Sequence, residues 1–133
     1  MILNQATDYA LRAVLYLSKK TRGEVVEARD IAAHEKIPMR FLLKIMPSLI
    51  KAGIVKSFRG VGGGYALAKA PGEITFLDVL EAIEGPVRIN KCLIDESYCN
   101  KQAAPHCAIH CALAGIQAKL IDELKNHNFA DFT

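Results

Sequence analysis

The first 91 residues of this 133-residue sequence contain no cysteine. All four cysteines fall within 20 positions, at Cys92, Cys99, Cys107 and Cys111. Where the surroundings keep thiols reduced, such clustering is typical of metal or redox chemistry and not of structural disulfides. The cysteine distribution therefore predicts a sensor or metal-binding segment in the C-terminal third.

Long apolar runs are also missing. No stretch reaches the roughly 18 apolar residues that a membrane span requires. The apolar run from Ala10 to Leu17 is short and contains Arg12, unlike the uninterrupted core of an export signal. We therefore expect a cytoplasmic protein that does not associate with membranes.

Several enzyme motifs are absent as well. The sequence has no C-x-x-C pair, no Walker lysine and no GxGxxG that leads directly into a helix. Nor does it offer a nucleophile, base and orienting group that can be placed together. We expect no enzymatic activity, and a thiol oxidoreductase has only the reactive cysteines in its favour.

Positive charge is concentrated in the middle of the chain. The net charge is +3, but residues 29–69 hold eight Lys or Arg and two acids, giving +6 for that segment. A basic centre between acidic flanks favours docking on a polyanion. A solvated basic face is the alternative interpretation of the charge alone.

Hydrophobic periodicity predicts a mainly α fold with a small β-hairpin wing. Apolar residues recur at helical spacing over residues 4–19, 27–35, 39–51, 75–84 and 106–125, and alternate over 54–58 and 65–68. Residues 87–105 read as a loop and 126–133 as a short tail. Pro47 predicts a bend near residues 43–46, or a helix that splits there. Helix, turn, helix and hairpin in this order indicate a winged helix-turn-helix.

The candidate DNA-binding residues follow from this order of elements. The second helix of the pair normally enters the major groove, where Arg pairs with guanine and Lys reaches guanine or phosphate. Arg59 leads a wing loop with four glycines in five positions, suited to a narrow minor groove. The candidates are Arg29, Met39, Arg40, Lys44, Arg59, Gly60, Gly62 and Gly63.

A family resemblance covers nearly the whole chain and is carried by residues 7–13, 30–32 with 37–38, 49–53, 59–65, and the cysteines after 78–85. It is a resemblance to the Rrf family of winged-helix transcription regulators, in its cysteine-containing branch that includes IscR and NsrR. It implies a homodimer that binds near-palindromic double-stranded DNA, with the wing arginine inserted and the C-terminal helix forming most of the dimer interface. We expect a repressor with three parts: a DNA-binding domain over 1–86, a cysteine-bearing loop over 87–105, and a dimerisation helix with tail over 106–133.

The resemblance also implies an iron–sulfur cluster, 2Fe–2S or 4Fe–4S, held by Cys92, Cys99 and Cys107 and sensing redox state, nitric oxide or cluster supply. Thiolates are the usual ligands of such clusters. We favour Cys111 as the fourth ligand because thiolate is soft and one helical turn separates it from Cys107. Asp8 and His110 are the alternatives. Zinc and cluster-free thiol sensing also remain open, although structural zinc sites usually show paired short spacings.

Overall fold

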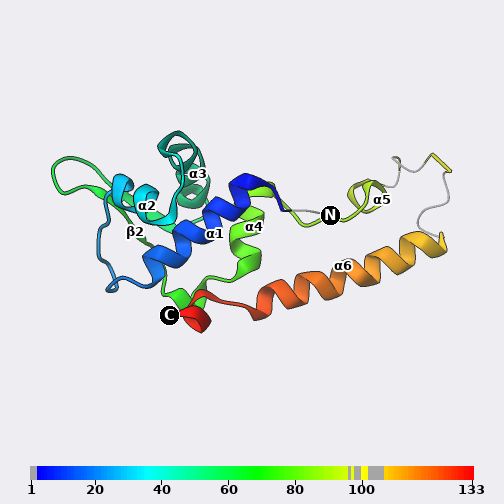
Figure 1. The fold of residues 1–133 in the computed structure, drawn as a ribbon. Coiled ribbons are helices and arrows are strands. Elements are labelled where there is room, and N and C mark those ends of the chain that lie inside the picture. Colours follow the sequence, from blue (N-terminus) through cyan, green and yellow to red (C-terminus); the bar gives the residue numbers. More distant parts are fainter. Residues whose placement is uncertain (1–2, 96, 98–99, 102–106) are drawn as a thin grey trace.

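The computed structural model describes residues 3–95, 97, 100–101 and 107–133. Its elements, in chain order, are α1 (Gln5–Ser18), α2 (Ala28–Glu35), α3 (Met39–Lys51), β1 (Val55–Phe58), β2 (Gly64–Leu67), the 3-10 helix η1 (Pro71–Glu73), α4 (Phe76–Glu84), α5 (Lys91–Ile94), α6 (Ala108–Asn126) and the 3-10 helix η3 (Phe129–Phe132). In Figure 1, α1–α4 and the hairpin form one body, from which α6 projects as a long arm. The predicted fold class, mainly α with a hairpin wing after a helix-turn-helix, is confirmed.

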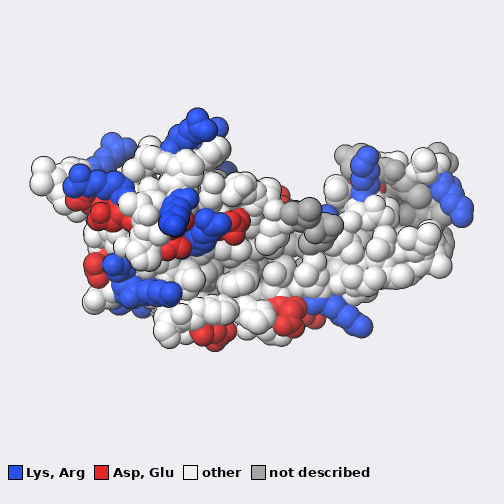
Figure 2. All heavy atoms as spheres, in the orientation of Figure 1, with Lys and Arg blue, Asp and Glu red and all other residues white. Residues whose placement is uncertain are grey.

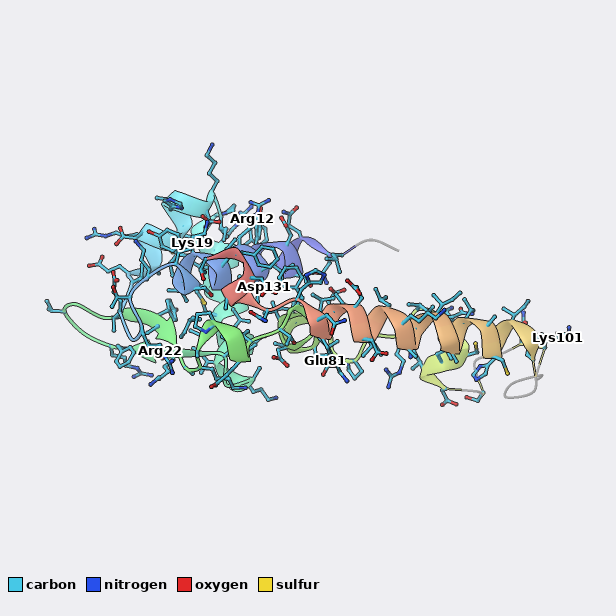
Figure 3. All side chains as sticks on the ribbon, turned by 90° about the horizontal axis from the view of Figure 1, so that it is seen from below. Arg12, Lys19, Arg22, Glu81, Lys101 and Asp131 are labelled. Carbon is cyan, nitrogen blue, oxygen red and sulfur yellow. The ribbon has the colours of Figure 1, made fainter. Side chains whose placement is uncertain are left out.

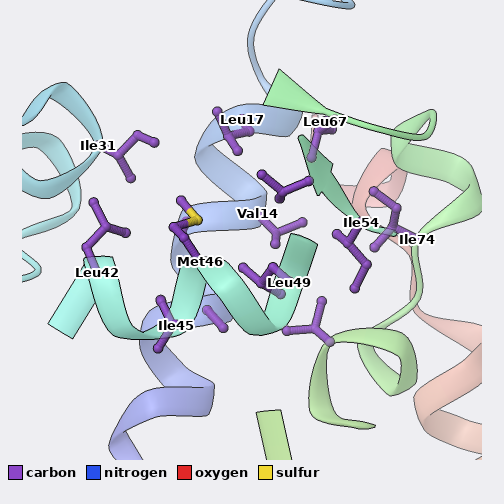
Figure 4. Packing of buried hydrophobic residues seen from close by; sticks show 14 of the residues in the cluster. Val14, Leu17, Ile31, Leu42, Ile45, Met46, Leu49, Ile54, Leu67 and Ile74 are labelled. Carbon is purple, nitrogen blue, oxygen red and sulfur yellow. The ribbon is translucent and has the colours of Figure 1, made fainter. Parts of the chain in front are cut away.

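The body is built around apolar side chains that the helices and the hairpin direct inward. Figure 4 shows Val14 of α1, Leu49 of α3 and Ile54 meeting at its centre. Side-chain caps fix the N-terminal ends of α1 and α4, whereas α2 and α3 begin without one. Asn4 accepts a hydrogen bond from the Thr7 backbone N–H at 2.8 Å, and Thr75 forms a reciprocal capping box with Asp78. Burial and capping together hold α1 to α4 in fixed positions around the core.

Helix α3 continues without a break through Pro47. The alternative prediction of a split helix is therefore wrong. Proline removes the hydrogen bond to the carbonyl of Leu43, four residues earlier. Both Leu43 and Pro47 lie on the exposed side of the helix, where water can satisfy that carbonyl. The buried side of α3 keeps its packing, and this compensates for the lost backbone bond.

The hairpin pairs β1 and β2 antiparallel, with Val55 opposite Leu67 and Phe58 opposite Gly64. Val26 forms an additional bridge to Tyr65, with two backbone hydrogen bonds of 2.8 Å. These bonds attach the hairpin to the segment that leads into α2. The wing is thereby held next to the helix-turn-helix.

The arm consists of α5 and α6. Residues 87–105 were predicted to be a loop throughout, but residues 91–94 form the short helix α5, which contacts α6. The backbone N–H of Ile89 donates to the side chain of Gln117 on α6 at 3.0 Å. With 19 residues, α6 is about 28 Å long at 1.5 Å per residue. No described helix is both long and apolar enough to cross a membrane.

The C-terminal residues are more than the short tail expected from the sequence. They return to the body, where the Phe129 side chain is 1 % exposed within the core. The backbone N–H of Phe76 donates to the His127 carbonyl at 2.9 Å, and that of Phe129 donates to the Ile74 carbonyl at 3.2 Å. In Figure 3, Asp131 lies back at the body while Lys101 lies beyond the opposite end of α6. The arm is therefore attached to the body at its C-terminal end.

We expect Phe129→Ala to lower the free energy of unfolding by about 3–5 kcal/mol, because it empties a fully buried aromatic site. Phe132→Ala is the matched control, since the Phe132 side chain is 46 % exposed, and it should cost less than about 1.5 kcal/mol. Urea denaturation followed by circular dichroism measures both. Equal losses for the two variants would contradict the anchoring role of Phe129.

Candidate nucleic-acid interface and cysteine segment

The exposed side of α3 presents the polar residues predicted to contact DNA. Leu42, Ile45, Met46 and Leu49 turn inward, which places Arg40 and Lys44 on the opposite side of the helix in solvent. The guanidinium of Arg40 lies over the ring of Phe41, 5.0 Å from its centroid. Lys44 takes part in no ion pair among the described residues. Both cations are therefore available to an anionic partner.

Apolar side chains are also exposed on α3, and the sequence reasoning missed the most exposed of them. Leu43 is 50 % exposed and Met39 is 38 % exposed. Met39 was a candidate from its position at the start of the helix, whereas Leu43 was not a candidate. Its place in the helical period, one residue past the inward-facing Leu42, is the signal that could have identified it.

Arg59 follows the last residue of β1 and leads the wing loop. Gly60 and Gly62 adopt φ values of 87° and 76°, which residues with a Cβ rarely adopt. A Cβ on Gly63 would lie 2.3 Å from the carbonyl oxygen of Phe58, so only glycine fits this turn. Arg59 is exposed and in no ion pair within the described chain. Val61 is wholly exposed beside it, a second wing residue that the sequence reasoning missed.

Arg29 occupies a different electrostatic setting from Arg59. Its Nε lies 2.7 Å from a carboxylate oxygen of Glu27, so part of its charge is already balanced. Arg29 and Arg59 both line a hollow of about 760 Å³ between the wing loop and the start of α2. The lining is mainly polar backbone and side-chain surface. Arg29 is therefore placed at the edge of the basic surface, with a weaker field than the unpaired cations provide.

Figure 2 shows lysine and arginine side chains gathered over α3 and beside the wing in this view. Figure 1 draws α3 at the top and the wing loop at the upper left of the body. A surface with unpaired cations attracts polyanions over several ångströms at low salt.

The three described cysteines lie on the arm. Cys92 belongs to α5, Cys107 is the N-cap residue of α6, and Cys111 follows one turn later. Cys92 and Cys107 carry free thiols, and the Asn90 side-chain amide lies 3.6 Å from the Cys92 sulfur. The N-terminus of a helix stabilises negative charge. Cys107 lies at such a terminus, which would favour the anionic thiolate that a metal ligand requires. Cys99 lies outside the described residues.

The two alternative fourth ligands differ in their surroundings. The carboxylate of Asp8 lies 2.6 Å from Arg12 on the same helix, so it has a partner already. The Nδ1 atom of His110 is buried and has no hydrogen-bond partner in the described structure. A buried imidazole nitrogen without a partner is costly unless it is satisfied by another group. Of these two alternative ligands, only His110 has a side-chain nitrogen without a hydrogen-bond partner in the described structure.

The described residues do not form a ready-made metal site. Among them, no three His, Cys, Asp or Glu side chains lie close enough together to hold one metal ion. The chemical types still fit a thiolate-bound centre, because Cys92 and the two cysteines of α6 lie on elements that contact each other. Near Cys92, the backbone N–H of Ser97 donates to Asp95 at 2.9 Å and lowers the pKa of that carboxyl group.

Comparison with known proteins gives consistent matches over the full length. A family model described as "Rrf2: Iron-dependent Transcriptional regulator" matches residues 3–133. A putative HTH-type transcriptional regulator from Aquifex aeolicus is 34 % identical, with 98 % of this chain and 90 % of that protein covered. The HTH-type transcriptional regulator NsrR from Bacillus licheniformis is 31 % identical over 98 % of this chain and 91 % of its own length.

A solved structure supports the same conclusion about the fold. CymR of Bacillus subtilis, titled the global cysteine regulator of that organism, superposes with a TM-score of 0.74 at 25 % identity. The match covers 98 % of this chain and 95 % of that structure. The similarity therefore includes the arm and the C-terminal return as well as the winged-helix body.

Proposed function

Because this chain belongs to the Rrf2 family of DNA-binding transcriptional regulators, we propose that it is a cytoplasmic, homodimeric repressor whose affinity for its operator depends on an iron–sulfur cluster. The DNA-binding part of this proposal rests chiefly on Arg59, an exposed arginine that leads the glycine turn of the wing and forms no ion pair among the described residues. Arg40 and Lys44 would enter the major groove while Arg59 reaches the adjacent minor groove. The sugar–phosphate backbone of the DNA would be contacted by Arg29, Gly60, Gly62 and Gly63.

The proposed homodimer rests on the exposed apolar side of α6. Ile109 is 67 % exposed and Ile116 is 56 % exposed, and none of the 19 residues of the helix is buried. An apolar helix face that a single chain leaves in water is typical of an interface. Two copies joined through α6 would present two recognition helices, as a near-palindromic operator requires.

Cys92, Cys99 and Cys107 would hold the cluster, with Cys111 as the fourth ligand. The cluster would supply reactivity toward redox agents or nitric oxide when bound. Ligation would fasten the segment with α5 to the first turn of α6, next to the Ile89–Gln117 hydrogen bond. The other end of α6 is anchored to α4. A structural change in the cysteine segment would therefore alter how α6 pairs with its copy in the proposed dimer. A tenfold change in DNA affinity needs only about 1.4 kcal/mol of coupling.

Two observations favour a second candidate, a regulator that senses through bare thiols. The described donor atoms are not grouped for a metal ion, and the similar CymR structure is titled a cysteine regulator. A zinc site is a further alternative, but it would need the same regrouping of donor atoms as the cluster. Measuring the iron, sulfide and zinc content of the purified protein distinguishes the cluster, zinc and bare-thiol candidates.

Arg59→Ala should weaken operator binding by about 10- to 100-fold, since a lost arginine–DNA contact costs about 1–3 kcal/mol. Lys125→Ala removes another exposed cation, in the last turn of α6, and should change binding little. Fluorescence anisotropy at physiological salt measures the affinity, and sedimentation confirms that the dimer is intact. Unchanged affinity for the Arg59 variant would rule out the wing contact.

Ile116→Asp should produce a monomer at micromolar concentrations, because it places an unpaired charge in the proposed interface. Ala118→Asp is the control, being exposed on a different side of the same helix. Sedimentation equilibrium reports the mass of each. A dimer that survives the Ile116 substitution would show that α6 does not form the interface.

Replacing Cys92, Cys99 or Cys107 by alanine should abolish cluster binding in protein purified without oxygen, because each removes a thiolate ligand. Iron and sulfide assays with the visible spectrum give the readout. Cys111→Ala should also lower cluster content, whereas His110→Ala and Asp8→Ala should not. Full cluster content in the first three variants would refute the ligand assignment, and wild-type protein without iron after reconstitution would favour the thiol or zinc candidate.

A further inference from the structure

Two apolar side chains on the recognition helix, Leu43 and Met39, are exposed beside the DNA-contacting cations. Their exposed fractions are 50 % and 38 %. They are four residues apart, so they lie one above the other on the same flank of α3. Arg40 and Lys44 occupy the neighbouring flank at the same spacing. The exposed side of α3 therefore carries an apolar row and a basic row side by side.

The proposed partner of this surface is defined by its chemistry. The unpaired cations next to the apolar row favour a polyanion over an apolar protein surface. The major groove of DNA presents one prominent apolar group, the C5-methyl of thymine. Guanine O6 and N7 in the same groove are the usual acceptors for arginine. DNA with thymine near guanine thus matches both rows.

We propose that Leu43, with Met39 beside it, reads a thymine methyl group in the operator. This inference rests on the proposed DNA-binding function and adds the identity of a base to it. Residues three apart on a helix have Cβ atoms roughly 5–6 Å apart, and successive base pairs are about 3.4 Å apart. The thymine should therefore lie within about two base-pair steps of the guanine contacted by Arg40.

The test uses the full chain purified without oxygen. Duplexes that the wild-type protein binds are first selected from a random pool, and each thymine of the selected half-site is then replaced by deoxyuridine. This replacement removes one methyl group and leaves base pairing unchanged. We expect one position, next to a selected guanine, at which the replacement weakens binding about three- to fivefold, the loss of one buried methyl contact.

The same scan on variants identifies the protein side of the contact. In Leu43→Ala, replacing the thymine at that position should change affinity less than about 1.5-fold. Ile50→Ala is the matched control, because Ile50 is 36 % exposed on the same flank but roughly 10 Å farther along the helix. It should keep the full thymine effect. Leu43 is half exposed, so its replacement leaves the core of the body intact.

Two outcomes would overturn the inference. One is a scan in which no deoxyuridine weakens wild-type binding. The other is a thymine effect of equal size in the Leu43 and wild-type proteins. In both cases the protein still binds its selected duplex, so the proposed function stands. If the selection enriches no duplex at all, the proposed function fails, and the thymine contact fails with it.

Discussion

Attachment of the C-terminal residues to the body is the constraint on which the arrangement of this protein depends. Phe129 fills a core site where η3 packs against η1 and α1 and its ring contacts that of Phe76. The backbone bonds of Phe76 and Phe129 fasten the end of α6. Helix α6 also packs against α4, and the attachment adds to this contact by fixing the C-terminal end of the helix. Cys107 and Cys111 lie at its N-terminal end. The position of the arm relative to the recognition helix is therefore set by packing.

The proposed DNA-contacting surface lies on the body, where α3 has exposed cations and exposed apolar groups. The proposed sensor segment lies on the arm, where α5 and the start of α6 contribute thiols. The body between them is tightly packed, and the Thr7 hydroxyl donates to Glu84 at 2.6 Å across α1 and α4. A change at the cysteines can alter DNA binding most simply by changing how two copies are joined, because that sets the spacing of their recognition helices.

The elements of the body were predicted well because apolar residues recur at regular spacing along each of them. Apolar spacing located α1–α4 and the hairpin within a residue or two, and Thr75 marked the start of α4. The elements that were missed are too short to show a period. α5 has four residues, and Phe129 is one aromatic residue in an eight-residue tail. Pro47 suggested a break that burial of the opposite side of α3 prevents.

The candidate site was predictable to different degrees in its two halves. Arg59 and its glycines are adjacent in sequence, so their joint role could be inferred directly. The exposure of Leu43 could have been inferred from the helical period of α3, because Leu42 and Ile45 face inward, but Leu43 was not a candidate. The cysteines could be identified by type, but their common site depends on the fold of a segment whose sequence has no regular pattern.

If the cysteine segment controls DNA binding as proposed, removal of the cluster from one anaerobic preparation will change its operator affinity. We expect the dissociation constants of the two forms to differ at least tenfold, while both stay dimeric. Equal affinities for a fully loaded and a cluster-free protein would contradict it.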